Sequence, residues 1–312
     1  MRVGLMVPPQ LDPRQVVPMA VRAEDQGFDF VACGEHVFFH GPVSNAFVTL
    51  AAAAGATSRI RLMTALTVLP IYPAVLAAKM IATLDGVSDG RVEIGVGVGG
   101  EHPPEFEACG VPIRERGRRT DESLNVLSAL FTGEPVHFAG RWTTLDGQIL
   151  EPAPVQRPAP PIWIGGRREA AIRRAGRHGD GWLPYLVTPE QLHAGLVTAR
   201  DAAVECGRAA EDVRGGVFCW AAVDIDGRWA RRTVLDVVSG IYQQDLSARA
   251  DSYLVAGTPT EVTSRLREHA GAGAETVVFA PACQSVDLER VVDTFATQVL
   301  PELRLAPMAT SS

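Results

Sequence analysis

Apolar residues follow two patterns along the chain: short continuous runs, and longer segments in which they recur every three or four residues. Short runs are typical of buried β-strands, and the longer pattern is typical of amphipathic helices. The short runs predict strands at residues 3–7, 28–33, 60–69, 92–97, 161–164, 181–184, 217–223 and 276–280. The segments between them predict helices at residues 14–26, 46–57, 74–87, 116–131, 168–176, 189–207 and 260–271.

This alternation predicts an α/β protein with a parallel sheet, because strands covered on both faces are nearly continuous in apolar residues. Eight strand–helix units favour a (β/α)8 TIM barrel over two doubly wound domains. No change in composition divides the chain, so we expect one domain over residues 1–312, with a loosely attached tail at about 305–312.

Three stretches exceed a minimal barrel, and we interpret them as insertions. The first is residues 100–115 after strand 4. The second is the polar and Pro-rich stretch 136–161 before strand 5, which predicts a hairpin and an extended connector. The third is residues 225–254 between strands 7 and 8, whose structure the apolar pattern does not resolve. Insertions of this kind are where barrels form substrate pockets.

Composition limits the functions that are open to the chain. Of its 312 residues, 46% are hydrophobic and 21% charged; the net charge is −7, and the two signs are interspersed. No basic stripe is available to neutralise nucleic acid phosphates. The five cysteines lack metal-ligand or disulfide spacing, and the apolar run after Arg2 is too short for a signal or a membrane span. We therefore expect a cytoplasmic protein without metal, membrane or nucleic acid partners.

A carboxylate and an imidazole follow the second predicted strand, in the segment "FVACGEHVFF". In a (β/α)8 barrel the loops after the strands form the active face, so Glu35 and His36 are expected to point toward the site. His36 exchanges a proton near neutral pH, and an adjacent carboxylate such as Glu35 is suited to orienting it. The structural alternative, a histidine paired with a backbone carbonyl at a strand end, is about equally compatible with the position alone.

Two glycine-rich turns follow predicted strands 4 and 5. Residues 95–100, "GVGVGG", allow a close backbone approach to a ligand or simply a tight strand exit. The second turn, "IGGRRE", joins a strand to a helix, where free N–H groups and the helix dipole favour an anion. We assign Gly165 and Gly166 to a phosphate, with Arg167 as an additional charge. The chain has no G-x-G-x-x-G opening a Rossmann unit, so bound NAD is poorly supported.

Longer segments are similar to a known family. The runs "LAAKMIATLDGVSDGRVEIGVGVGG", "FEACGVPIRERGRRTDESL", "LEPAPVQRPAPPIWIGG" and "GRHGDGW" resemble the bacterial luciferase-like flavin and deazaflavin oxidoreductases over residues 3–279. The "GEH" after strand 2 resembles the branch that uses coenzyme F420, a 5-deazaflavin. The resemblance implies that His36 lies near the reacting carbon of the deazaflavin, that a non-prolyl cis peptide joins Ala65 to Leu66 behind its ring, and that the protein is a homodimer. It implies a cofactor cradle from Ala65, Leu66, Gly97, Val98, Gly99, Gly100, Gly165, Gly166 and Arg167.

Three functions remain open from the sequence. The leading one is an F420-dependent oxidoreductase that transfers hydride between the deazaflavin C5 and a small organic substrate, with His36 as proton donor or acceptor. The second is an FMNH2-dependent monooxygenase that uses oxygen, and the third is a non-catalytic flavin-binding homologue.

The substrate site is predicted from aromatic residues. Phe38 and Phe39, with Phe47, suggest an apolar lip, although these rings suit packing beneath the loop equally well. Trp182 and Tyr185, at the end of the sixth predicted strand, are further candidates for the pocket or the core. Glu101 is more typical of a solvated loop.

Overall fold

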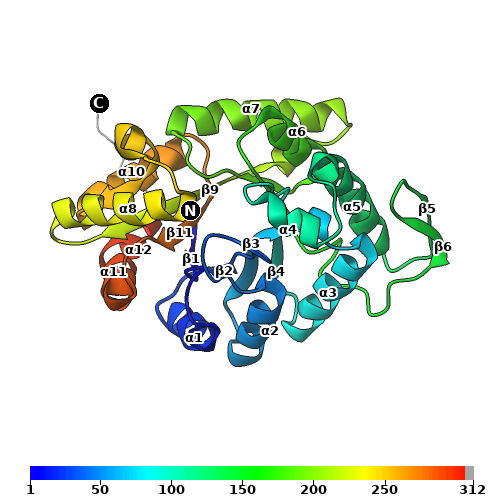
Figure 1. Ribbon diagram of the computed structural model, residues 1–312, viewed down its shortest axis with the longest axis horizontal. Helices are drawn as coiled ribbons and strands as arrows, with labels where there is room; N and C mark the ends of the chain where they lie inside the picture. Colours follow the sequence, from blue (N-terminus) through cyan, green and yellow to red (C-terminus); the bar gives the residue numbers. More distant parts are fainter. Residues whose placement is uncertain (306–312) are drawn as a thin grey trace.

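Parallel strands close into a barrel in the computed structural model, which describes residues 1–305 (Figure 1). The strands that close the ring are, in order, β1 (Arg2–Met6), β2 (Phe30–Cys33), β3 (Arg61–Val68), β4 (Val92–Gly97), β7 (Ile162–Gly165), β8 (Gly181–Leu183), β9 (Arg214–Val223) and β11 (Thr276–Pro281). β11 pairs with both β1 and β9, and β9 pairs with β8, so the sheet has no gap. The predicted (β/α)8 fold is confirmed, with each predicted strand present.

Helices surround the strands in Figure 1. Those predicted from the sequence are α1 (Val16–Asp25), α2 (Ala46–Ala56), α3 (Ala74–Val87), α5 (Arg116–Leu130), α6 (Glu169–His178), α7 (Pro189–Glu205) and α10 (Pro259–Gly271). The chain then ends in α11 (Leu288–Thr294), a π-helical turn (Phe295–Val299) and α12 (Leu300–Arg304), which the apolar pattern had not indicated.

Local signals explain where several helices begin. α7 and α10 start with a capping box, in which Thr188 pairs with Gln191 and Thr258 pairs with Glu261. Each has proline in its first turn, where the missing N–H costs nothing. The side chain of Asn45 caps α2 by accepting from the Val48 N–H. These caps fix where each strand-to-helix loop ends.

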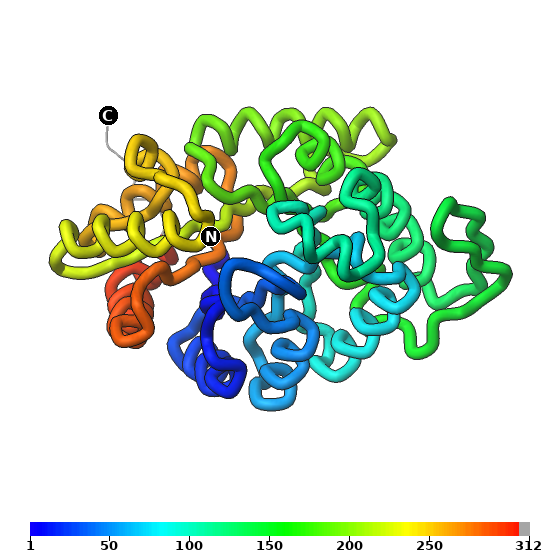
Figure 2. Tube along the Cα trace, viewed as in Figure 1, coloured from blue at the N-terminus to red at the C-terminus, as the bar shows by residue number. Residues whose placement is uncertain are grey.

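The three insertions have distinct structures. Residues 100–115 contain α4 (Pro103–Ala108), and residues 225–254 contain α8 (Gly227–Tyr242) and α9 (Ala250–Tyr253). A further strand, β10 (Val255–Gly257), pairs with the carboxyl end of β9. The predicted hairpin is formed by β5 (Val136–Ala139) and β6 (Thr144–Gln148), and it projects from one side of the molecule (Figure 2).

A buried carboxylate organises the amino-terminal end of the barrel. Glu93 on β4 is 1% exposed and receives hydrogen bonds from Arg2, from Arg61 and, at 2.8 Å, from the Trp163 indole N–H. Burial by itself raises the pKa of Glu93, but the hydrogen bonds and charges of its partners outweigh burial, so its pKa lies below the ordinary value. The network ties β1, β3, β4 and β7 together at the end of the barrel opposite the site described below.

Some expectations concern features outside this fold. The predicted tail at about 305–312 lies, apart from Leu305, outside the described residues. Within residues 1–305, none of the helices combines the length and the apolar character that crossing a membrane requires. The same residues hold no cluster of three or more His, Cys, Asp or Glu side chains arranged for a metal ion.

Candidate active site

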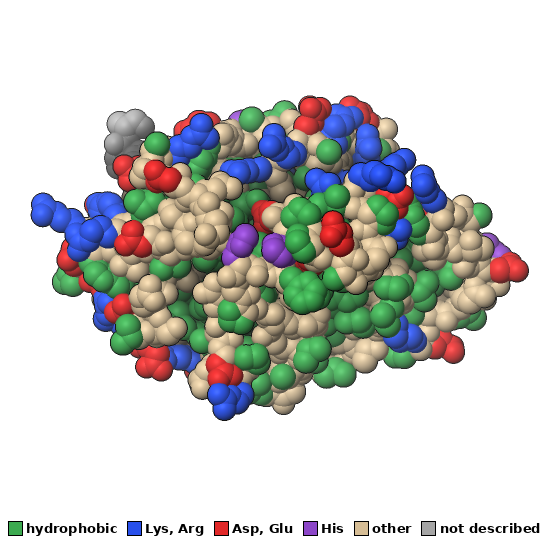
Figure 3. Space-filling view, viewed as in Figure 1, with side chains coloured by type: hydrophobic (Ala, Val, Ile, Leu, Met, Phe, Trp, Pro, Cys, Tyr) green, Lys and Arg blue, Asp and Glu red, His purple; other side chains and the backbone are tan. Residues whose placement is uncertain are grey.

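A cavity of about 310 Å³ opens at the carboxyl ends of the barrel strands. Its walls come from the loops after β1, β2, β4, β7, β8 and β11, from β3 and β9, and from α8. Histidine side chains lie at the centre of the same face in the space-filling view, and Lys and Arg side chains gather over α5 and α6 (Figure 3). This is the end of a (β/α)8 barrel where active sites form.

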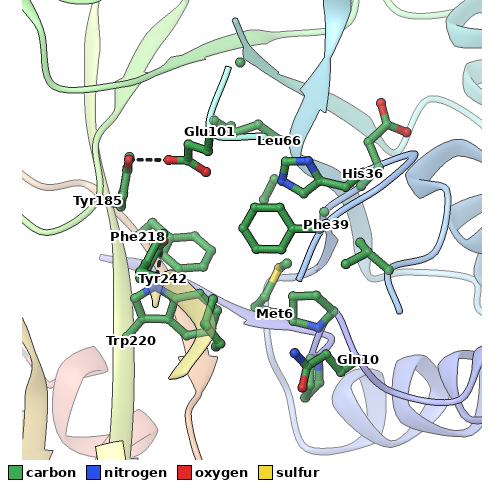
Figure 4. A pocket seen from close by; sticks show the side chains of 18 of the residues that line it. Met6, Gln10, His36, Phe39, Leu66, Glu101, Tyr185, Phe218, Trp220 and Tyr242 are labelled. Atoms are coloured by element: carbon green, nitrogen blue, oxygen red, sulfur yellow. Dashed lines mark hydrogen bonds between the residues drawn. The ribbon is translucent and has the colours of Figure 1, made fainter. Parts of the chain in front are cut away.

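His36 lies on one wall of the cavity (Figure 4). Its Nδ1 is 2.8 Å from Oε2 of Glu105, which belongs to α4, and its ring stacks on Phe39 with centroids 4.3 Å apart. The Glu105 side chain is 2% exposed and its Oε1 has no partner among the described residues. Because the carboxylate holds Nδ1, the ring orientation is set and Nε2 is the nitrogen available to a bound molecule.

Glu35 has a structural role that differs from the predicted one. Its carboxylate accepts hydrogen bonds from the Thr67 hydroxyl, the Val68 N–H, the Tyr72 hydroxyl, the Asn45 side chain and the Ala46 N–H. Burial raises the pKa of Glu35, and these bonds offset only part of that effect. Glu35 therefore ties the β2 loop to β3 and to the start of α2, and Glu105 is the carboxylate that orients His36.

The glycines on β4 and β7 allow close packing around Leu66 and its strand. A Cβ on Gly165 would lie 2.0 Å from Leu66 Cδ1, and one on Gly95 would meet the Thr64 carbonyl oxygen first and Leu66 Cδ2 at 2.8 Å. The expected non-prolyl cis peptide bond joins Ala65 and Leu66, and both residues line the cavity. Gly165 thus makes room for Leu66, which forms an apolar floor in contact with the cavity, and Gly95 makes room for the backbone of β3 as well.

The turn after β7 leads into the first turn of α6, which no side chain caps. Gly166 has a φ of +99°, which favours glycine, and its carbonyl accepts the Trp182 indole N–H at 2.8 Å. Arg167 donates to the carbonyl of Leu186 and stacks over the Tyr185 ring at 5.3 Å. Trp182 therefore supports the turn from behind, and uncapped N–H groups remain at the start of α6.

An aromatic wall, defined here as Tyr185, Phe218, Trp220 and Tyr242, faces His36 across the cavity (Figure 4). The Tyr185 hydroxyl donates to Glu101 at 2.7 Å, and the Trp220 indole N–H donates to the Tyr242 hydroxyl at 3.2 Å. Burial, followed by the charge of Glu101, raises the pKa of Tyr185, and burial raises the pKa of Tyr242. Both phenols are therefore neutral at physiological pH.

A cysteine thiol also lines the cavity. Burial raises the pKa of Cys283 to about 12, so the thiol stays protonated and is a poor nucleophile.

The structure brings together most of the site residues predicted from the sequence. The cavity is lined by Glu35, His36, Phe39, Ala65, Leu66, Gly97, Val98, Gly99, Gly165 and Gly166. Four predicted residues do not line it: Phe38, Gly100, Arg167 and Trp182. Phe38 is 52% exposed, Trp182 is buried behind the turn after β7, and Gly100 faces Arg116. The expected apolar lip is thus reduced to Phe39, because Phe47 packs in the core against Tyr72.

Sequence reasoning missed Glu105, and it placed Glu101 in a solvated loop. The signal for Glu105 was the sequence "HPPEFEA", because Pro-Pro followed by an acidic residue is typical of the first turn of a helix. Trp220 lies on a predicted strand, but the side of the strand on which its side chain lies depends on strand register. Tyr242 lies in the insertion 225–254, whose helices the apolar pattern did not predict. Tyr185 was a candidate and does line the cavity.

A closed (β/α)8 barrel with a cavity at the carboxyl ends of its strands, lined by an oriented imidazole, has the architecture of a barrel enzyme. The family model described as luciferase-like monooxygenase matches residues 1–275. The chain belongs to this luciferase-like family.

Named relatives point to more than one chemistry. The chain is 28% identical to the F420-dependent glucose-6-phosphate dehydrogenase of Nakamurella multipartita, covering 95% of this chain and 94% of that protein. It is 33% identical to an uncharacterized protein of Mycobacterium tuberculosis, covering 59% of this chain and only 63% of that relative's length. The crystal structure of the monooxygenase RslO1 from Streptomyces bottropensis superimposes with a TM-score of 0.84 at 26% identity, covering 96% of this chain and 99% of that one.

Proposed function

We propose that this protein is an F420-dependent oxidoreductase that interconverts an alcohol and a carbonyl compound. The observation that carries the proposal is the His36–Glu105 pair at 2.8 Å, in which His36 lines a largely apolar cavity and Glu105 lies behind it. A buried carboxylate behind a cavity-facing imidazole is the arrangement of a general base or acid. The F420-dependent relative supports a deazaflavin as the hydride carrier.

The residues present fit such a cofactor. The flat face of a tricyclic ring suits the apolar floor formed by Ala65 and Leu66, and its polar edge suits the backbone of residues 97–99. The uncapped start of α6, preceded by Arg167 and Arg168, fits the cofactor phosphate, because helix N-termini bind anions. When bound, the deazaflavin supplies a carbon that accepts or donates hydride.

The chain itself handles the proton. With Nδ1 held by Glu105, the Nε2 atom of His36 accepts the hydroxyl proton when an alcohol is oxidised, or returns it when a carbonyl is reduced. Glu105 stabilises the imidazolium that forms, since the carboxylate is buried and close. Leu66 and the aromatic wall line the cavity with apolar surface, which favours a low local dielectric for this step.

A second candidate function is an FMNH2-dependent monooxygenase. The structural similarity to a monooxygenase at 26% identity favours it, and an apolar cavity also suits oxygen chemistry on an organic substrate. The two functions differ in the cofactor, which is therefore the first quantity to measure.

The test is a titration of the purified apoprotein with F420 and, separately, with FMN, followed by fluorescence quenching. We expect saturable binding of F420 at micromolar concentrations and weaker binding of FMN. Micromolar binding of FMN with no response to F420 would reverse the ranking. Loss of absorbance of oxidised F420 on addition of an alcohol then tests the direction of hydride transfer.

A further inference from the structure

We propose that the substrate is an uncharged, ring-bearing alcohol or the corresponding ketone, and that the aromatic wall holds its ring. This inference rests on the proposed function and goes beyond it, because it excludes the sugar phosphate class named for the F420-dependent relative.

The cavity lining contains no permanently charged cation to pair with an anionic substrate. Among the described residues that line it, none is Lys or Arg, whereas Glu35 and Glu101 are carboxylates. The nearby Arg167 stacks on Tyr185, donates to the Leu186 carbonyl and does not line the cavity. A phosphate or carboxylate entering beside Glu101 would lose its hydration without gaining an ion pair, which disfavours such ligands strongly.

The aromatic wall presents one continuous apolar face. Tyr185 and Tyr242 are stacked at 6.0 Å with an angle of 18°, Phe218 meets Trp220 edge-on at 5.1 Å, and Trp220 meets Tyr242 edge-on at 6.4 Å. Val237 and Ile241 of α8 extend this face. The rings lie on one side of the cavity (Figure 4) and do not surround a centre, as an aromatic cage for an ammonium group does. Such a face fits a neutral ring.

Two polar donors of the wall already have acceptors. Tyr185 donates to Glu101, and Trp220 donates to Tyr242. A substrate hydroxyl therefore gains most on the opposite side of the cavity, where Nε2 of His36 is available. On oxidation, the C–H bond breaks with its electron pair leaving as hydride to the cofactor, the O–H proton goes to His36, and the C=O bond forms.

The test compares a neutral ring-bearing alcohol with anionic ligands. 1-Phenylethanol and mandelate share a phenyl ring and a hydroxyl-bearing carbon, but mandelate has a carboxylate where 1-phenylethanol has a methyl group. Dissociation constants are measured by calorimetry on the F420-loaded protein and on the FMN-loaded protein, with glucose 6-phosphate as a third ligand. We expect 1-phenylethanol to bind at least tenfold more tightly than either anion.

Variants test whether the ligand preference arises from residues that line the cavity. Phe218→Ala should weaken 1-phenylethanol about tenfold, while Val197→Ala, a change at an exposed residue of α7, should leave its affinity unchanged. Glu101→Gln should reduce the ratio of the mandelate dissociation constant to that of 1-phenylethanol at least threefold, because it removes a charge that repels mandelate.

The outcomes separate this inference from the proposed function. Failure of F420 to bind refutes the cofactor proposal and still leaves the ligand ranking measurable with FMN. Equal or tighter binding of mandelate or glucose 6-phosphate, or no detectable binding of 1-phenylethanol, overturns the substrate class.

Discussion

The role of Glu105 can be tested by the substitution Glu105→Gln, which keeps the shape of the side chain and removes its charge. At the 2.8 Å separation from Nδ1 of His36, a full ion pair is worth about 6 kcal/mol at an effective dielectric constant of about 20. Only part of the imidazolium charge has developed in the transition state, and the His36 side chain is 21% exposed. The substitution should therefore raise the activation free energy by about 2–3 kcal/mol, which lowers kcat roughly 30- to 150-fold.

The assay is the rate of F420 reduction by a neutral ring-bearing alcohol at saturating cofactor, with kcat and KM determined separately. F420 affinity should stay within about threefold of wild type, because Glu105 does not line the cavity. Glu107→Gln, an exposed neighbour on α4, is the matched control and should retain full activity. An unchanged kcat in Glu105→Gln, or a loss confined to cofactor affinity, would show that the carboxylate has no part in the proton transfer.

Three further predictions follow from the same contacts. His36→Ala should lower kcat while the F420 dissociation constant changes by less than about tenfold; weaker binding with an unchanged kcat would instead make the imidazole a positioning group. Gly165→Ala should lower the free energy of unfolding by about 1–3 kcal/mol in urea titrations, because its Cβ meets Leu66 at 2.0 Å, and adding Leu66→Ala should recover part of the loss if that clash is the cause. Glu93→Gln should cost about 3 kcal/mol at neutral pH, since it breaks a buried charge network. The folded-state pKa of Glu93 is lowered, so its contribution is present above the ordinary glutamate pKa of about 4.3 and is lost as the pH falls through the lower folded value; a stability difference between wild type and variant that does not shrink in acid would contradict this.

The predicted site residues that line the cavity owe their place to local chain geometry. His36 and the glycines at 97, 99, 165 and 166 lie at the ends of predicted strands or in the loops just after them, and the carboxyl ends of all strands meet at one face of a barrel. The prediction that Glu35 orients His36 was wrong, because the carboxylate that contacts His36 is that of Glu105. Residues adjacent in the chain point in different directions at a strand end, so proximity in sequence did not make Glu35 the orienting carboxylate.

The amino-acid sequence alone determined the barrel, because the period of apolar residues and the order of strands and helices are local properties that the parallel topology then assembles in one way. Only the tertiary structure decided which side chains share the cavity. Glu105 reaches His36 from 69 positions away, and the aromatic wall combines side chains from β9, α8 and the loop after β8. Such contacts depend on how the inserted helices α4 and α8 pack over the barrel mouth, and no pattern within either segment specifies that packing.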